Sequence, residues 1–185
     1  MATSAVDVRR WTREEYDQLA SAGVLRPDER LELIDGVIYE RTPQNSRHAV
    51  SIVALQEALR SAFPQGNHVR VQLPLALGLD SEPEPDLAVV MGGWWDYRDV
   101  HPTTALLVVE VSESSSAHDH KRKLSLYARS GIPEYWILDV AVERLEVYRE
   151  PEEERYRSRG ILQAGDSVTP LAAPAASIAV AELLP

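Results

Sequence analysis

The sequence predicts an α/β fold in which a mixed β-sheet is flanked by helices. Segments with the two-residue alternation of strands are interspersed with segments of helical periodicity along the whole chain. One run, Ala105–Val111, is almost continuously apolar, which is typical of a strand covered on both faces, so we expect it at the centre of the sheet. A length of 185 residues suits one hydrophobic core, and we expect residues 1–185 to form a single domain.

Amino-acid composition and net charge limit the classes of protein to which this chain can belong. Hydrophobic residues make up 44% and charged residues 26% of the chain, which is ordinary for a globular protein and argues against a disordered one. Lys and Arg number 19 against 29 for Asp and Glu, so the net charge of −10 repels a polyanion at long range. The charge therefore argues against nonspecific, high-affinity coating of nucleic acid. It leaves open a local basic patch that contacts phosphates and a carboxylate site for a divalent cation.

Cysteine is absent from the sequence, which excludes disulfides, thiolate nucleophiles and cysteine-based zinc or iron–sulfur sites. The first residues lack the apolar core of a signal peptide, and no apolar segment approaches the length of a membrane span. We therefore expect a cytoplasmic protein that does not contact a membrane.

Three segments have the signals of helices. Thr12 followed by Glu15 is a capping-box pattern, and Asn45 or Ser46 is a suitable N-cap for a second helix. The predicted helices cover Arg13 to about Ala22, Asn45 or Ser46 to about Phe63, and about His118 to Ser130. Each is followed by a helix-ending Gly or Pro.

The remaining patterned segments predict strands. Asp35-Gly36 between two alternating stretches is a strong hairpin signal. The predicted strands are the two halves of Arg30–Glu40, Val69–Leu73, Leu87–Met91, Ala105–Val111, Glu134–Val140, Arg144–Glu150 and about Tyr156–Leu162. The alanine-rich tail from Leu171 to Pro185 is compatible with either a docked strand or a short helix.

Two carboxylates occupy unusual positions in these strands. Glu110 lies between Val109 and Val111, where an ionised carboxylate is costly unless it is paired or binds a metal, and Asp86 stands just before another apolar strand. If neighbouring strands bring Asp86 and Glu110 together, their oxygens are suitable ligands for Mg²⁺. The alternative is that Asp86 caps a turn and Glu110 pairs with a buried Arg or Lys.

A cation beside such a site would stabilise the charge that develops when metal-activated water attacks a phosphodiester. Lys121 and Lys123 are the candidates. Asp119, Lys123 and Tyr127 share one side of the predicted helix, so Lys123 can face inward while Lys121 and Arg122 stay in solvent. Glu32, between apolar residues, is a further candidate acid or a simple strand-edge charge.

Five segments together resemble the Uma2-like endonucleases of the PD-(D/E)XK nuclease superfamily, and the resemblance covers most of the chain. They are Glu32–Glu40 (ELIDGVIYE), His48 at the start of a helix, Pro85–Val90 (PDLAVV), Val108–Glu113 (VVEVSE) and Asp119–Asp139 (DHKRKLSLYARSGIPEYWILD). The last segment is the most specific. The resemblance implies a restriction-endonuclease-like mixed β-sheet core flanked by helices.

The resemblance also implies a set of functional residues. Asp86 corresponds to the family's PD aspartate and Glu110 to the acid of the second half-motif, both as metal ligands. Glu32 corresponds to the acid from the N-terminal part of the fold, a further ligand or a base that orients water. The superfamily's usual lysine would fall at Ser112, and Lys123 instead matches the displaced lysine of the Uma2-like pattern.

Other conspicuous side chains have two interpretations each. His48 is either an ordinary histidine at a helix start or a contact to a phosphate or to metal-bound water. Trp94 and Trp95 could stack on bases, but a subunit contact suits an acidic chain better. His118, Asp119 and His120 point apart on a helix and do not predict a zinc site. Trp136 is expected in the core.

The functional hypothesis is a Mg²⁺-dependent endonuclease that hydrolyses DNA phosphodiester bonds, with Mn²⁺ as a possible substitute and Glu32, Asp86, Glu110 and Lys123 at its catalytic site. A homodimer would suit cleavage of two strands. Two alternatives stay open: a nuclease-like module that binds DNA or a protein without cutting, and a metal hydrolase acting on a small phosphate ester.

Overall fold

A six-stranded mixed sheet forms the centre of the structure. The structure is a computed structural model that describes residues 8–26, 28–41, 43–63, 66–113 and 117–185. For residues 117–119 it describes the backbone alone. The strands are β1 (Leu31–Ile34), β2 (Val37–Glu40), β3 (Asn67–Val71), β4 (Leu87–Met91), β5 (Leu107–Ser112), β6 (Glu134–Asp139), β7 (Arg144–Glu152), β8 (Arg155–Gln163), β9 (Ser167–Val168) and β10 (Ile178–Ala179). The α-helices are α1 (Arg13–Ser21), α2 (Ser46–Ala62) and α3 (Ala117–Arg129), and the 3-10 helices are η1 (Trp94–Tyr97) and η2 (Val180–Glu182).

The predicted central strand is confirmed. The large sheet has the order β3-β4-β5-β6-β7-β8, so β5 has three strands on one side and two on the other, and all of its residues are buried. Strands β5 and β6 are parallel and are joined by α3, whereas every other neighbouring pair in this sheet is antiparallel. The parallel pair needs a crossover connection, and α3 provides it.

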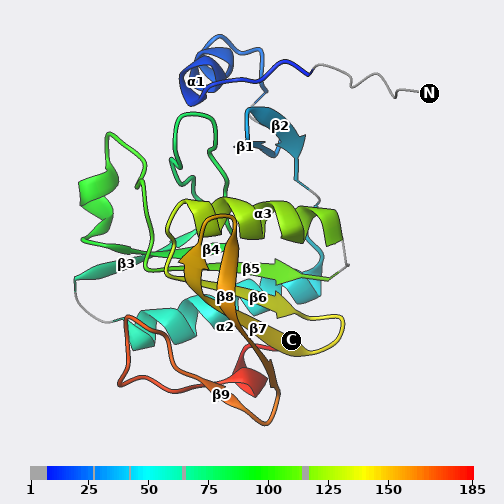
Figure 1. The fold of residues 1–185 in the computed structure, drawn as a ribbon, viewed down its shortest axis with the longest axis vertical. Coiled ribbons are helices and arrows are strands. Elements are labelled where there is room, and N and C mark those ends of the chain that lie inside the picture. Colours follow the sequence, from blue (N-terminus) through cyan, green and yellow to red (C-terminus); the bar gives the residue numbers. More distant parts are fainter. Residues whose placement is uncertain (1–7, 27, 42, 64–65, 114–116) are drawn as a thin grey trace.

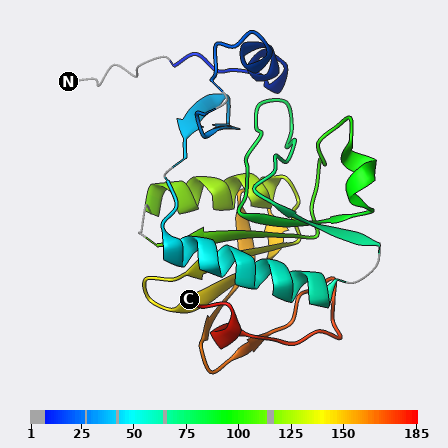
Figure 2. The same ribbon diagram turned by 180° about the vertical axis from the view of Figure 1, so that it is seen from behind.

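Helices cover both faces of the sheet: α3 lies on one face and α2 on the other (Figures 1 and 2). Alternate residues of the strands face the two sides. On β5, Val109 packs into the core beneath α2 with Leu55, and Val108 packs into the core beneath α3 with Leu126. The fully buried Trp136, predicted as a core residue, belongs to the α2 side.

The β1–β2 hairpin is attached beside this sheet and faces the start of β4. Asp35 and Gly36 form its turn with φ of 53° and 71°, as the Asp-Gly pair predicts. Leu33 of β1 forms a bridge with Glu82, through backbone hydrogen bonds of 2.7 and 3.3 Å. This bridge holds the hairpin against the segment that leads to Asp86.

The main departures from the predicted elements lie at strand ends and in the tail. β3 begins at Asn67 and ends at Val71, two residues earlier than predicted, because Gln72 has φ of 51° and leaves the extended conformation. The tail contains both alternatives, a short strand (β10) and a single 3-10 turn (η2). Within the described ranges, no helix is both long and apolar enough to cross a bilayer.

Candidate active site

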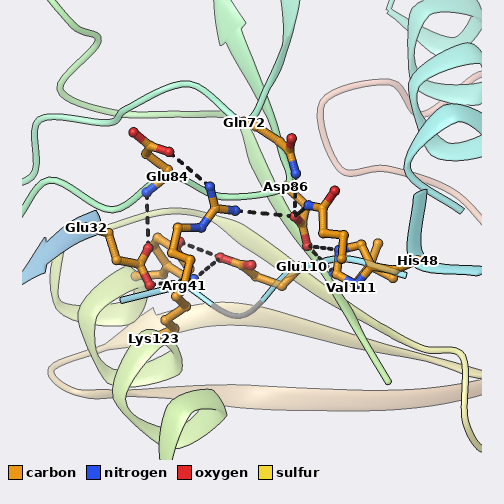
Figure 3. A network of polar contacts seen from close by, with 11 residues as sticks. Glu32, Arg41, His48, Gln72, Glu84, Asp86, Glu110, Val111 and Lys123 are labelled. Atoms are coloured by element: carbon orange, nitrogen blue, oxygen red, sulfur yellow. Dashed lines mark hydrogen bonds and ion pairs between the residues drawn. The ribbon is translucent and has the colours of Figure 1, made fainter. Parts of the chain in front are cut away.

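The four predicted site residues converge in one pocket of about 330 Å³ (Figure 3). Its wall comes from β1, β2, the starts of α2 and β4, the end of β5 and the first turns of α3. The lining residues are Glu32, Tyr39, Glu40, Arg41, Pro43, Gln44, His48, Asp86, Glu110, Val111, Ser112, Glu113, His120, Arg122 and Lys123. The lining contains five carboxylates and three positively charged side chains, so its formal charge is −2 when the histidines are neutral. Such an excess favours a cation over an anion.

Strand register brings Asp86 and Glu110 together. Leu87 of β4 is paired with Val109 of β5, so Asp86, one residue earlier, lies opposite Glu110, one residue later. Side chains directly opposite on antiparallel strands share a face and approach within about 5.5 Å at Cβ. Two buried carboxylates therefore meet at the same end of two neighbouring strands.

Lys123 reaches these acids from α3, as predicted. Its Nζ lies 3.1 Å from Glu110 Oε1 and 3.2 Å from Glu32 Oε1. Tyr127, one turn further along α3, donates a hydrogen bond of 2.9 Å to the same oxygen of Glu110. Lys123 is buried and Lys121 is exposed, because residues two apart on a helix face different sides.

One part of the helix prediction is wrong. Arg122 was expected in solvent, but it is half-buried and its guanidinium lies 3.6 Å from the centre of the Tyr39 ring. The β1–β2 hairpin supplies this aromatic surface, which no local pattern in α3 indicates. Arg122 thus lines the pocket beside Lys123.

Glu110 has an unusual protonation equilibrium. Burial raises its pKa to about 7, and the nearby carboxylates of Asp86 and Glu32 add to this effect, while Lys123 opposes it. Glu110 is paired with a buried lysine, as the structural alternative from the sequence supposed, yet the same carboxylate also lines an open pocket. Glu110 therefore belongs both to a buried ion pair and to the wall of the pocket.

Asp86 is the better stabilised anion. Burial raises its pKa, but contacts from His48 and from the backbone N–H of Val111 outweigh burial and bring the pKa below its ordinary value. The Val111 N–H donates to Oδ2 at 2.9 Å, and His48 Nε2 lies 3.3 Å from the same oxygen. His48 therefore faces the site, rather than only occupying a helix start.

Two residues that the sequence did not single out complete the ionic network. Arg41, just after β2, lies 2.9 Å from Glu84 Oε2 and 3.5 Å from Asp86 Oδ1 (Figure 3). The backbone N–H of Glu84 also donates to Glu32 Oε2 at 3.2 Å. Arg41 directly follows the hairpin motif, but only the folding of that hairpin onto the start of β4 reveals its role.

The donor set fits a hard divalent cation at Asp86 and Glu110. The contacts to Asp86 Oδ1 from the described residues are long, at 3.3, 3.4 and 3.5 Å from Gln72, Gln44 and Arg41, so they orient this oxygen and still leave it able to bind a cation. Mg²⁺ commonly uses one or two carboxylates and completes its shell with water and phosphate. Glu32 is instead held by Lys123 and Glu84, and no cluster of three or more metal-binding side chains occurs among the described residues.

Of the other conspicuous residues, only His120 lines the pocket among those whose side chains the structure describes. Trp94 and Trp95 of η1 are exposed by 66% and 59% and pack edge to face with each other. They follow the far end of β4, away from Asp86 at its start. The side chains of His118 and Asp119 are not among the described ones, whereas His120 lines the pocket.

Comparison with known proteins agrees with this architecture. The fold is that of a nuclease-like α/β protein: a putative nuclease of DUF820 from Anabaena variabilis ATCC 29413 superposes with a TM-score of 0.75 at 17% identity, covering 93% of this chain and 96% of that one. Residues 13–181 match Uma2, described as a putative restriction endonuclease, and the chain belongs to this family. No curated protein matches the chain.

Proposed function

We propose that this protein is a Mg²⁺-dependent endonuclease that hydrolyses DNA phosphodiester bonds, with Mn²⁺ as a substitute. The observation that carries the proposal is the pair of opposed carboxylates, Asp86 and Glu110, beside Lys123 in an open pocket. Membership of a family described as putative restriction endonucleases supports nucleic acid as the substrate.

Each residue has a proposed role. Asp86 and Glu110 would hold the divalent cation, which would supply Lewis-acid chemistry for the attack of water on phosphorus. Lys123 stabilises negative charge developing next to Glu110. Glu32 completes the acidic set, as a further ligand or as an orienting group, and through its 3.2 Å contact it holds Lys123 in place.

The electrostatics of the pocket are consistent with these roles. Its formal charge of −2 is equal in magnitude and opposite in sign to the charge of one divalent cation, so such a cation would neutralise the lining. The neutralisation would be local to the pocket, because one divalent cation changes the protein's net charge only from −10 to −8.

The domain organisation, the oligomeric state and the cellular location of the protein are proposed as well. Residues 1–185 are taken as one domain that acts as a homodimer, since a symmetric dimer is the commonest oligomer and its two sites would suit cleavage of both strands of a duplex. A cytoplasmic location is consistent with a chain of 185 residues that contains no cysteine.

The test is nicking of supercoiled plasmid with Mg²⁺, with Mn²⁺ and with EDTA. We expect cleavage with either metal, and its loss in Asp86→Asn and Glu110→Gln, each of which removes ligand charge at nearly constant size. Glu40→Gln is the matched control, because it neutralises an exposed pocket carboxylate outside the proposed set and should retain cleavage.

Three outcomes contradict the proposal. Nicking at the wild-type rate by either site variant removes the assignment of those carboxylates. DNA binding without metal-dependent cleavage supports the non-cleaving module instead, and turnover of a small phosphate ester without plasmid nicking supports the small-substrate hydrolase.

A further inference from the structure

Gln72, directly after β3, has an unfavourable backbone conformation. Its φ of 51° lies in the left-handed region, which favours glycine. The other described non-glycine residues with positive φ lie in or near the turns of β-hairpins: Asp35, Glu143, Glu150 and Glu153. Gln72 lies in no such turn, so a compensating interaction is expected there.

That interaction is with Asp86. The backbone N–H of Gln72 donates to the Asp86 carbonyl at 3.1 Å, and the side-chain Nε2 donates to Asp86 Oδ1 at 3.3 Å. Backbone strain that persists next to a functional side chain is a recognised feature of active sites. Here the left-handed turn aims the amide of Gln72 at the carboxylate (Figure 3).

The other contacts of Asp86 divide between its two oxygens. Oδ2 is fixed by the Val111 N–H, and Oδ1 is approached by Arg41, Gln44 and Gln72, of which Gln72 is nearest. An amide donor is neutral, so Gln72 orients the carboxylate without cancelling its charge. A carboxylate oxygen has lone pairs for both this hydrogen bond and a cation.

We propose that Gln72 is a positioning residue that fixes the orientation of the Asp86 carboxylate for the divalent cation. Gln72 is not part of the pocket lining, so it acts through Asp86 and not on substrate. This inference rests on the proposed function of Asp86 as a cation ligand. Hydrogen-bonding partners of metal ligands typically change metal affinity by about 10- to 100-fold when they are removed.

The test compares Gln72→Gly with Glu153→Gly by calorimetric titration of Mn²⁺ into the metal-free protein and by thermal melts in EDTA. Glu153 is an exposed residue in the β7–β8 turn with the same φ of 51°, so both changes relieve the same backbone conformation. We expect similar shifts of melting temperature in the two variants. Only Gln72→Gly should weaken Mn²⁺ binding, by about 10-fold or more.

A second variant, Gln72→Asn, keeps an amide and tolerates the left-handed region, but its shorter side chain does not reach Asp86. It should lose Mn²⁺ affinity as Gln72→Gly does. Wild-type affinity in both variants overturns the proposal, as does a much larger loss of melting temperature in Gln72→Gly than in Glu153→Gly. If the wild-type protein does not bind Mn²⁺, the proposed function is overturned together with this inference. If Gln72→Gly binds Mn²⁺ as the wild type does while Asp86→Asn does not, only the inference about Gln72 is overturned.

Discussion

The Asp86 carboxylate accepts a hydrogen bond of 2.9 Å from the backbone N–H of Val111, the residue that follows Glu110. An acid just before β4 is thereby attached to the main chain of the central strand. Because β5 is buried along its whole length, this attachment fixes the spacing of the two proposed metal ligands more firmly than side-chain contacts alone. The relationship underlies the predictions for the site.

Lys123→Ala should lose about 100-fold or more of the metal-dependent nicking rate, the usual effect of removing one group that stabilises transition-state charge. Lys121→Ala should remain close to wild type, because Lys121 is exposed and outside the pocket lining. Plasmid nicking by both variants, with circular dichroism to verify folding, provides the measurement. Equal losses would show that the placement of Lys123 beside Glu110 has no catalytic role.

Divalent cations should raise the melting temperature of the wild-type protein. Binding only to the folded state contributes about 2.7 kcal/mol when the free cation is at a hundredfold excess over Kd. Glu110→Gln should show little gain with Mn²⁺. Without metal it should be at least as stable as wild type, since burial disfavours the charge it removes and Lys123 keeps its 3.2 Å contact with Glu32.

Thermal melts of both proteins in EDTA and in Mn²⁺ distinguish the two roles of Glu110. A marked loss of stability in metal-free Glu110→Gln would make Glu110 a structural ion-pair partner. Absence of any gain with metal in the wild type would contradict the cation site.

Glu82 should make the protein less stable as the pH rises from about 5 to 7. Burial raises its pKa from 4.5 to about 7, with Asp17 adding and Arg13 opposing. The folded state therefore binds more protons than the unfolded state in this window, and stability decreases with pH until it levels off above pH 7. The shift corresponds to at most about 3 kcal/mol.

Denaturant titrations of wild type and Glu82→Gln at pH 5 and pH 8 measure this effect. The variant should gain stability relative to wild type at the higher pH. Glu110 also has a raised pKa, but it is present in both proteins, so its contribution to the pH dependence cancels in the difference between them. A constant difference between the two proteins at both pH values would show that Glu82 does not titrate abnormally.

Gly36→Ala should be more destabilising than Gly23→Ala. Both glycines have φ of +71°, where an L-residue costs about 1–2 kcal/mol. A Cβ on Gly36 would also lie 2.8 Å from Arg10 Cβ and 3.0 Å from the Trp11 backbone nitrogen, whereas a Cβ on Gly23 meets nothing within 4 Å. Melting temperatures of the two variants give the difference, and equal values would mean that the hairpin tip is not packed as described.

Local patterns in the sequence were sufficient for most of the secondary structure. The capping box at Thr12 and the turn at Asp35-Gly36 are both present, because each depends on residues within one turn of chain. The end of β3 was missed, because the positive φ at Gln72 has no local signal in a glutamine.

The sequence by itself determined which acids are out of place: Glu32, Asp86 and Glu110 lie in or beside apolar strands, where a charge needs a partner. Helix periodicity also predicted that Lys123 faces inward. Only the tertiary structure decided that Lys123 contacts Glu32 and Glu110. It also decided that Asp86 is contacted by Arg41 from beyond the hairpin and by the Val111 backbone of β5. Alternation within a strand gives the face of each side chain but not the register against its neighbour, which is set by contacts between residues distant in the chain. The opposition of Asp86 and Glu110, and with it the site, follows from that register.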